Sequence, residues 1–137
     1  MVYSKNIKSI VMFTYNNSFT SFSVNDLKKA KAFYQQTLGL ETTETPEGLS
    51  VKTSDGIPIF LYPKENHEPA TFTVLNFKVS NIEETVDKLT AGGVSFLHYE
   101  GELQTDKKGI FRGNGPTIAW FTDPAGNILS VIQDNKN

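Results

Sequence analysis

The stretch FSVNDLKKAKAFYQQTLGL, residues 22–40, contains a complete strand-to-helix unit. Phe22 and Val24 alternate with a serine, which is the two-residue period of a half-buried β-strand. The polar pair Asn25-Asp26 follows, and such residues cap helices. Gly39 is suited to the left-handed conformation that ends many helices. Between cap and glycine runs an apolar stripe at helical spacing, made of Leu27, Ala30, Tyr34 and Leu38.

The same pattern returns in FKVSNIEETVDKLTAGGV, residues 77–94. Leu75, Phe77 and Val79 alternate as a strand, and Ser80 followed by Glu83 fits a capping box. The second helix ends at a pair of glycines, and its apolar stripe is Ile82, Val86 and Leu89. The chain is therefore an internal duplication.

After each helix the strand pattern resumes, interrupted by turn residues such as Asp55-Gly56 and Ala125-Gly126. The segments SDGIPIFLY and PAGNILSVI, which contain these turns, also echo each other. Each half therefore predicts one strand, one helix and three further strands. We predict a single domain over residues 1–137, with a first module at 19–62, a polar linker, YPKENHEPAT, and a second module at 72–133.

Two segments, VNDLKKAKAFYQQTLGL and WFTDPAGN, make the duplicated chain resemble the vicinal oxygen chelate superfamily. This is also called the glyoxalase, bleomycin-resistance and extradiol-dioxygenase superfamily, and the resemblance covers roughly Phe19 to Gln133. It implies an α+β fold of two tandem βαβββ modules whose sheets form a cup-shaped half-barrel. It also implies that metal and substrate bind on the concave face of that cup.

The composition restricts the possible functions. A hydrophobic content of 38% is enough for a packed core. The net charge of −2, from 13 basic and 15 acidic residues, does not suggest a partner such as nucleic acid or an anionic membrane. Absence of cysteine removes disulfides and thiolate chemistry. The apolar run from Ile10 to Phe13 is too short for a signal peptide or a membrane span, so a cytoplasmic protein is expected.

Strand alternation predicts which side chains face the cup, because successive residues of a strand point to opposite faces. If the alternating apolar residues pack under the helices, their neighbours line the concave side. From the first module these are Phe19, Ser21, Ser23, Phe60 and Tyr62, and from the second Val74, Asn76, Lys78, Trp120 and Ser130. Four aromatic side chains in this set, Phe19, Phe60, Tyr62 and Trp120, are expected to share one concavity.

The resemblance implies four metal-ligand positions, one on the first and one on the last strand of each module. In this sequence they read Phe19, Phe60, Val74 and Ser130, whereas divalent metals need carboxylate or imidazole donors. We therefore predict no metal and no other cofactor. His98, in the expected strand after the second helix, lies near two glutamates and more simply belongs to a solvated strand end. Asp123 is expected to bind its own turn.

The segment Tyr99 to Thr117 is a long, polar, glycine-rich connection, and such loops are often lids or binding loops. Phe111 and Arg112 in its middle are candidates to close over a ligand, with Arg112 suited to an anion. The alternative is a disordered loop without a role. The aromatic cup has an alternative of its own, which is a second hydrophobic core with no room for a ligand.

The function predicted from these residues is metal-free binding of an apolar or aromatic small molecule, as in bleomycin-type resistance proteins. A homodimer is expected, with the groove between two protomers. The alternative is a lyase, isomerase or dioxygenase that uses a non-standard metal site or none. We predict no catalytic residue, because Lys78 and Tyr62 are the only titratable groups expected in the cup. The run KSIVMFTY, residues 8–15, is either an extra strand or a dimer contact.

Overall fold

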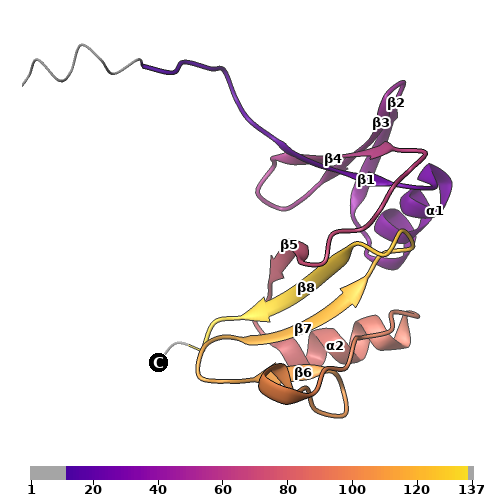
Figure 1. The fold of residues 1–137 in the computed structure, drawn as a ribbon. Coiled ribbons are helices and arrows are strands. Elements are labelled where there is room, and N and C mark those ends of the chain that lie inside the picture. Colours follow the sequence, from indigo (N-terminus) through magenta and orange to yellow (C-terminus); the bar gives the residue numbers. More distant parts are fainter. Residues whose placement is uncertain (1–11, 136–137) are drawn as a thin grey trace, which may run out of the picture.

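The computed structural model describes residues 12–135 and contains two βαβββ modules (Figure 1). The first consists of β1 (Thr20–Val24), α1 (Leu27–Lys31), the π-helical η2 (Ala32–Thr37), β2 (Glu41–Thr45), β3 (Gly48–Lys52) and β4 (Pro58–Pro63). The second consists of β5 (Thr73–Lys78), α2 (Ile82–Ala91), the 3₁₀-helical η3 (Gly101–Leu103), β6 (Ile110–Arg112), β7 (Thr117–Thr122) and β8 (Ile128–Gln133). The predicted α+β architecture of tandem modules is confirmed. No helix in the described part of the chain is long and apolar enough to cross a membrane.

Each module forms its own four-stranded sheet. The strand orders are β1-β4-β3-β2 and β5-β8-β7-β6, so the duplication in the sequence is also a duplication of topology. The first strand of each module runs parallel to the last, and the other neighbours are antiparallel. Over residues 12–135, the two sheets do not join edge to edge into one half-barrel sheet.

The helix starts show the predicted capping, with one correction. The side chain of Asp26 accepts from the backbone N–H of Lys29 at 3.1 Å. In the second module the cap is Asn81, whose Oδ1 accepts from the N–H of Glu84 at 3.0 Å. The expected capping box of Ser80 and Glu83 is therefore wrong by one residue. Asn81 takes the role because its own backbone is the last extended one before the helix.

A further correction concerns the first strand after α2. The sequence places a strand around His98, but only Phe96 forms an isolated bridge there, to Phe121. The chain then leaves the sheet, makes a 3₁₀ turn, and returns as β6 at Ile110–Arg112. The polar, glycine-containing segment predicted as a loop therefore contains the edge strand of the second sheet.

The hydrophobic core lies on the helix-facing sides of both sheets and is shared by the two modules. The aromatic rings of Phe33, in η2, and Phe121, in β7, lie 6.4 Å apart. Leu38 and Leu40 at the end of that helix face Phe77 of β5 across a small apolar cavity. The η2 end of the first helix therefore packs against the second module. Here the open face of a sheet means the face opposite its helix.

The buried carboxylate of Asp123 stabilises this contact between the modules. Asp123 is only 4% exposed, and its Oδ1 accepts from the backbone N–H groups of Ala125 and Asn127, both at 2.9 Å, as predicted for a self-bonded turn. Its Oδ2 accepts from the hydroxyl of Tyr34 at 2.8 Å and from the Asn127 amide at 3.0 Å. Burial, together with the neighbouring Asp123 carboxylate, raises the pKa of Tyr34 well above its usual range, so Tyr34 stays a donor.

The segment before β1 extends away from the body of the molecule as an arm (Figure 1). Four large side chains along it, Met12, Phe13, Tyr15 and Phe19, are 62–81% exposed. Phe13 and Tyr15 stack on each other with ring centroids 5.1 Å apart. Of the run KSIVMFTY, residues 8–11 lie outside the described part. Residues 12–15 form no strand.

Candidate functional site

The open face of the first sheet carries the aromatic pair predicted there. Phe60 and Tyr62, both on β4, are half-buried and stack with ring centroids 6.5 Å apart. The Phe60 ring lies over Gly48, where an added Cβ would come within 2.9 Å of the ring. Ser21 and Ser23 of β1 pair with these residues in register, so they share this face. Alternation therefore predicted the face correctly over β1 and β4.

The open face of the second sheet is built around the single tryptophan. Trp120 is half-buried, with Tyr99 edge-on at 5.3 Å and Phe111 tilted at 6.0 Å. Trp120 pairs with Ser130 on β8, whose Oγ donates to the Oδ1 of Asn76 at 2.5 Å. Lys78, next along this face, forms an exposed ion pair with Asp134 at 3.2 Å.

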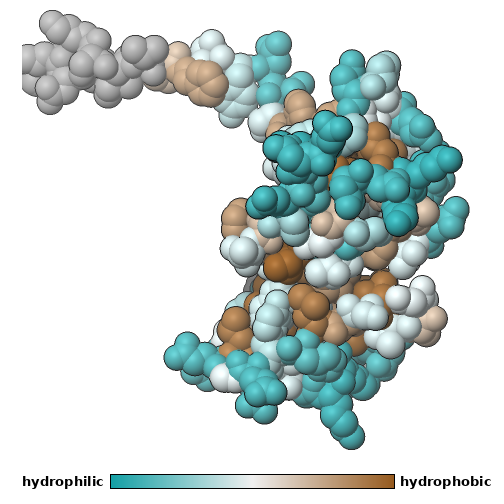
Figure 2. All heavy atoms as spheres, turned by 45° about the vertical axis from the view of Figure 1, so that its right-hand side comes forward, coloured by the Kyte–Doolittle hydropathy of each residue, from teal (hydrophilic) through white to brown (hydrophobic). Residues whose placement is uncertain are grey.

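The two aromatic groups are separate in this chain. Phe60 and Tyr62 contact each other on the first sheet, and Trp120 contacts Tyr99 and Phe111 on the second. Within residues 12–135, the aromatic contacts therefore form two groups rather than the expected single one. Figure 2 shows hydrophobic side chains gathered in a band between two hydrophilic ends on one face of the molecule.

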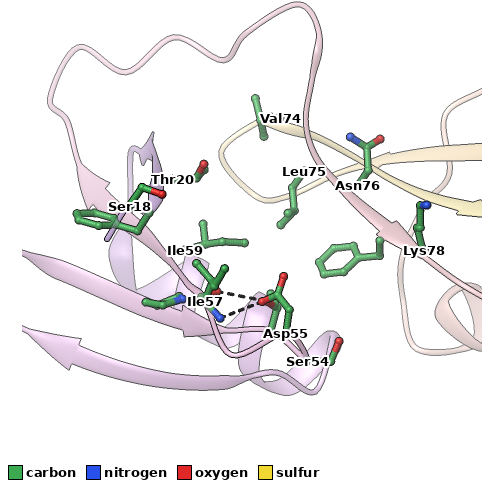
Figure 3. A pocket seen from close by; sticks show the side chains of 14 residues that line it. Ser18, Thr20, Ser54, Asp55, Ile57, Ile59, Val74, Leu75, Asn76 and Lys78 are labelled. Carbon is green, nitrogen blue, oxygen red and sulfur yellow. Dashed lines mark hydrogen bonds between the residues drawn. The ribbon is translucent and has the colours of Figure 1, made fainter. Parts of the chain in front are cut away.

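Two grooves lie where the modules meet. The inter-module groove, about 740 Å³, runs between β5 and the β3–β4 turn. Figure 3 shows Val74, Leu75, Asn76 and Lys78 on one side, and Ser18, Thr20, Ile57 and Ile59 on the other. The linker groove, about 430 Å³, is lined by β1, Tyr62, Asn127 and residues 68–74.

Three predicted site residues have surroundings that the sequence did not predict. Val74 is the extra residue of a bulge between Thr73 and Leu75, so it faces both grooves and leaves the regular register. Phe19 lies on the exposed arm and lines the inter-module groove. Arg112 forms ion pairs with Glu83 at 2.6 Å and Asp106 at 3.4 Å. A ligand anion would have to compete with both carboxylates for Arg112.

The four positions implied for a metal do not fit one. Phe60 and Val74 are hydrocarbon, Phe19 is an exposed hydrocarbon ring, and the Ser130 hydroxyl already donates to Asn76. Divalent metals are held by carboxylate, imidazole or thiolate groups, so this set offers no suitable donor. Within residues 12–135, no group of three or more histidine or acidic side chains is placed to hold a metal ion.

Sequence reasoning missed one polar contact. His67, in the linker, lies with its Nδ1 2.6 Å from the Oγ of Ser23 and its Nε2 3.0 Å from the carbonyl oxygen of Ala125. It thus contacts both modules. The only sign of this contact in the sequence is that residue 67 is a histidine, because a polar, proline-containing linker does not show which way a side chain points.

Comparisons with solved structures support the fold. A glyoxalase family protein from Bacillus anthracis is 21% identical, with a TM-score of 0.65 over 90% of this chain and 100% of that one. The fosfomycin resistance protein FosX from Listeria monocytogenes is 16% identical, with a TM-score of 0.65 over 90% and 96%. TnmS3, an antibiotic-binding protein from a Streptomyces species, is 19% identical, with a TM-score of 0.63 over 90% and 100%. At these identities the likeness concerns the fold alone.

The comparison with curated proteins gives no match. A family model, by contrast, matches residues 17–131, which is most of the chain and includes both modules. The duplicated topology and the self-bonded turn at Asp123 lie within this range. The chain belongs to the Glyoxalase/Bleomycin resistance protein/Dioxygenase superfamily.

Proposed function

We propose that this protein binds an apolar or aromatic small molecule without a metal ion, on the open faces of its sheets. The observation that carries the proposal is the setting of Trp120. Its indole is only half-buried although two aromatic side chains flank it, so part of the ring faces solvent on an open sheet. Aromatic walls with few polar groups suit flat ligands, which they hold by stacking and dispersion.

Polar groups near Trp120 would orient such a ligand. Ser130 and Asn76 already bond to each other, which leaves further hydrogen-bonding capacity on the exposed Asn76 amide. On the first sheet, Ser21 offers a hydroxyl beside Phe60. Two of the superfamily's solved structures are described as a resistance protein and an antibiotic-binding protein, which agrees with this class of ligand.

We further propose a homodimer in which a second copy completes the site. Each sheet presents an aromatic open face, and no further sheet in the described part of the chain is available to pair with it. The first sheet of one protomer and the second sheet of its partner would together bring Phe60 and Tyr62 near Trp120. The arm supports this arrangement, because exposed Met12, Phe13, Tyr15 and Phe19 are typical of a surface covered by another protein.

Trp120→Ala tests the binding site. We expect the affinity for an aromatic ligand to fall by about 2 kcal/mol, the cost of removing a large aromatic anchor at a binding hot spot. Because Trp120 is half-buried, the fold should survive. The measurement is calorimetric titration with an aromatic compound that first changes the tryptophan fluorescence of the unmodified protein, together with a thermal melt of the variant.

A matched control is Leu103→Ala, since Leu103 in η3 is 48% exposed and lines neither groove. Its affinity should remain close to that of the unmodified protein. If Trp120→Ala instead lowers the melting temperature strongly while no aromatic compound changes the fluorescence of the unmodified protein, the open face is a hydrophobic core and the binding proposal is wrong.

A further inference from the structure

The contact between Ser23 and His67 has a defined proton arrangement. The Nε2 atom of His67 lies 3.0 Å from the carbonyl oxygen of Ala125, which can only accept a hydrogen bond. In the neutral ring Nε2 therefore carries the hydrogen, and Nδ1 keeps its lone pair. The Ser23 hydroxyl, 2.6 Å from Nδ1, must then be the donor.

This is the arrangement of an activated hydroxyl nucleophile. Such a nucleophile needs a base within hydrogen-bonding distance, and a third group that holds the base in the correct tautomer and orientation. Here the imidazole is the base and the Ala125 carbonyl is the third group. The contact spans 44 residues between Ser23 and His67, and 58 between His67 and Ala125, so the tertiary fold creates it.

Ser23 is also accessible to a ligand. It lines the linker groove together with the hydroxyl-bearing Ser21 and Tyr62 and the apolar Phe72 and Val74. The acidic Glu68 also lines this groove, which disfavours an anion there. The groove therefore suits an uncharged compound with apolar substituents.

We propose that Ser23 is a nucleophilic serine, with His67 as its general base, that takes the acyl group of an uncharged activated ester. Oγ forms a bond to the carbonyl carbon while its proton passes to Nδ1 of His67. The bond from that carbon to the leaving oxygen breaks, and the leaving alcohol takes the proton back from the imidazole. Ser23 then carries the acyl group as an ester. This reactivity lies beyond the proposed binding function, which does not require it.

The acyl group should persist on Ser23 rather than be hydrolysed quickly. Rapid turnover needs hydrogen-bond donors for the negative charge that develops on the carbonyl oxygen. Asn127 lines the same groove, but its side-chain amide already donates both hydrogens, one to the Ser23 carbonyl oxygen and one to Asp123, each at 3.0 Å. We therefore expect a stoichiometric adduct.

An alkyl fluorophosphonate tests the proposal on the full chain, since it reacts with activated serine hydroxyls by the same proton transfer and releases fluoride. Intact mass should show one adduct per chain, and peptide mapping should place it on Ser23.

Variants separate reactivity from accessibility. Ser23→Ala should abolish the adduct, and His67→Gln should slow it about 100-fold, the scale of a lost general base. Ser95→Ala should leave it unchanged, because Ser95 is an exposed serine after α2 and lies outside the linker groove. The mapping on the unmodified protein decides the question even if a variant misfolds. No adduct on Ser23, or equal labelling of Ser21 and Ser23, would show that the contact with His67 is only structural.

Discussion

Replacing Asp123 by alanine is expected to lower the free energy of unfolding by about 3–5 kcal/mol, at the high end for a single substitution, because it breaks a buried hydrogen-bond network. Four donors lose their acceptor at once: the Tyr34 hydroxyl, two backbone N–H groups and the Asn127 amide. Each donor left buried and unpaired costs about 1–3 kcal/mol before the structure relaxes. The loss should be visible in chemical denaturation followed by far-UV circular dichroism.

Two control variants show where this loss comes from. Tyr34→Phe removes one donor and should cost about 1–2 kcal/mol, because the Asp123 Oδ2 keeps its bond to Asn127. Asp55→Ala changes the corresponding turn of the first module, where the carboxylate is exposed and accepts from Ile57 and Thr53. The midpoint of chemical denaturation of Asp55→Ala should be close to that of the unmodified protein. Equal losses for Asp55→Ala and Asp123→Ala would contradict the account of how the modules are joined.

Gly48→Ala is expected to cost about 3 kcal/mol, at the upper end of the range for overpacking a well-packed interior. Gly48 is buried in β3, and an added Cβ would lie 2.2 Å from the carbonyl oxygen of Leu61 on the neighbouring strand. Backbone cannot move aside as a flexible side chain can. The same Cβ would push the Phe60 ring off its position, so affinity for an aromatic ligand should fall as well.

Gly92→Ala is the matched control, because an added Cβ there would make only ordinary contacts, at 3.5 Å, with backbone oxygens at the end of α2. Its melting temperature should stay close to that of the unmodified protein. A Gly48→Ala protein as stable as Gly92→Ala would mean that β3 and β4 are less closely packed than this structure has them.

The architecture could be predicted from the sequence because both halves carry the same pattern of strand, helix-cap and turn residues, and the same pattern forms the same local structure. Alternation placed Phe60, Tyr62 and Trp120 on the open faces, since strand geometry alone decides that side. It did not predict the bulge at Val74, because a bulge changes neither polarity nor spacing in the sequence. The strand at Ile110–Arg112 was missed because three residues in a polar segment carry little periodic signal.

Relations between the modules could not be predicted at all. Tyr34 fits the stripe of its helix, yet its partner Asp123 lies 89 residues away, and no local pattern connects them. The same holds for Ser23 and His67. The single concavity was inferred from two sheets treated as one, whereas each module forms its own four-stranded sheet.

Native mass spectrometry of the full chain tests the central claim most directly, because one spectrum reports the number of chains, bound organic molecules and metal ions. After addition of an aromatic compound selected by its effect on Trp120 fluorescence, we predict the mass of two chains with that compound bound. We also predict no added mass of a divalent metal. A single chain that carries a stoichiometric metal ion and does not retain the compound would contradict a metal-free site completed by a second copy.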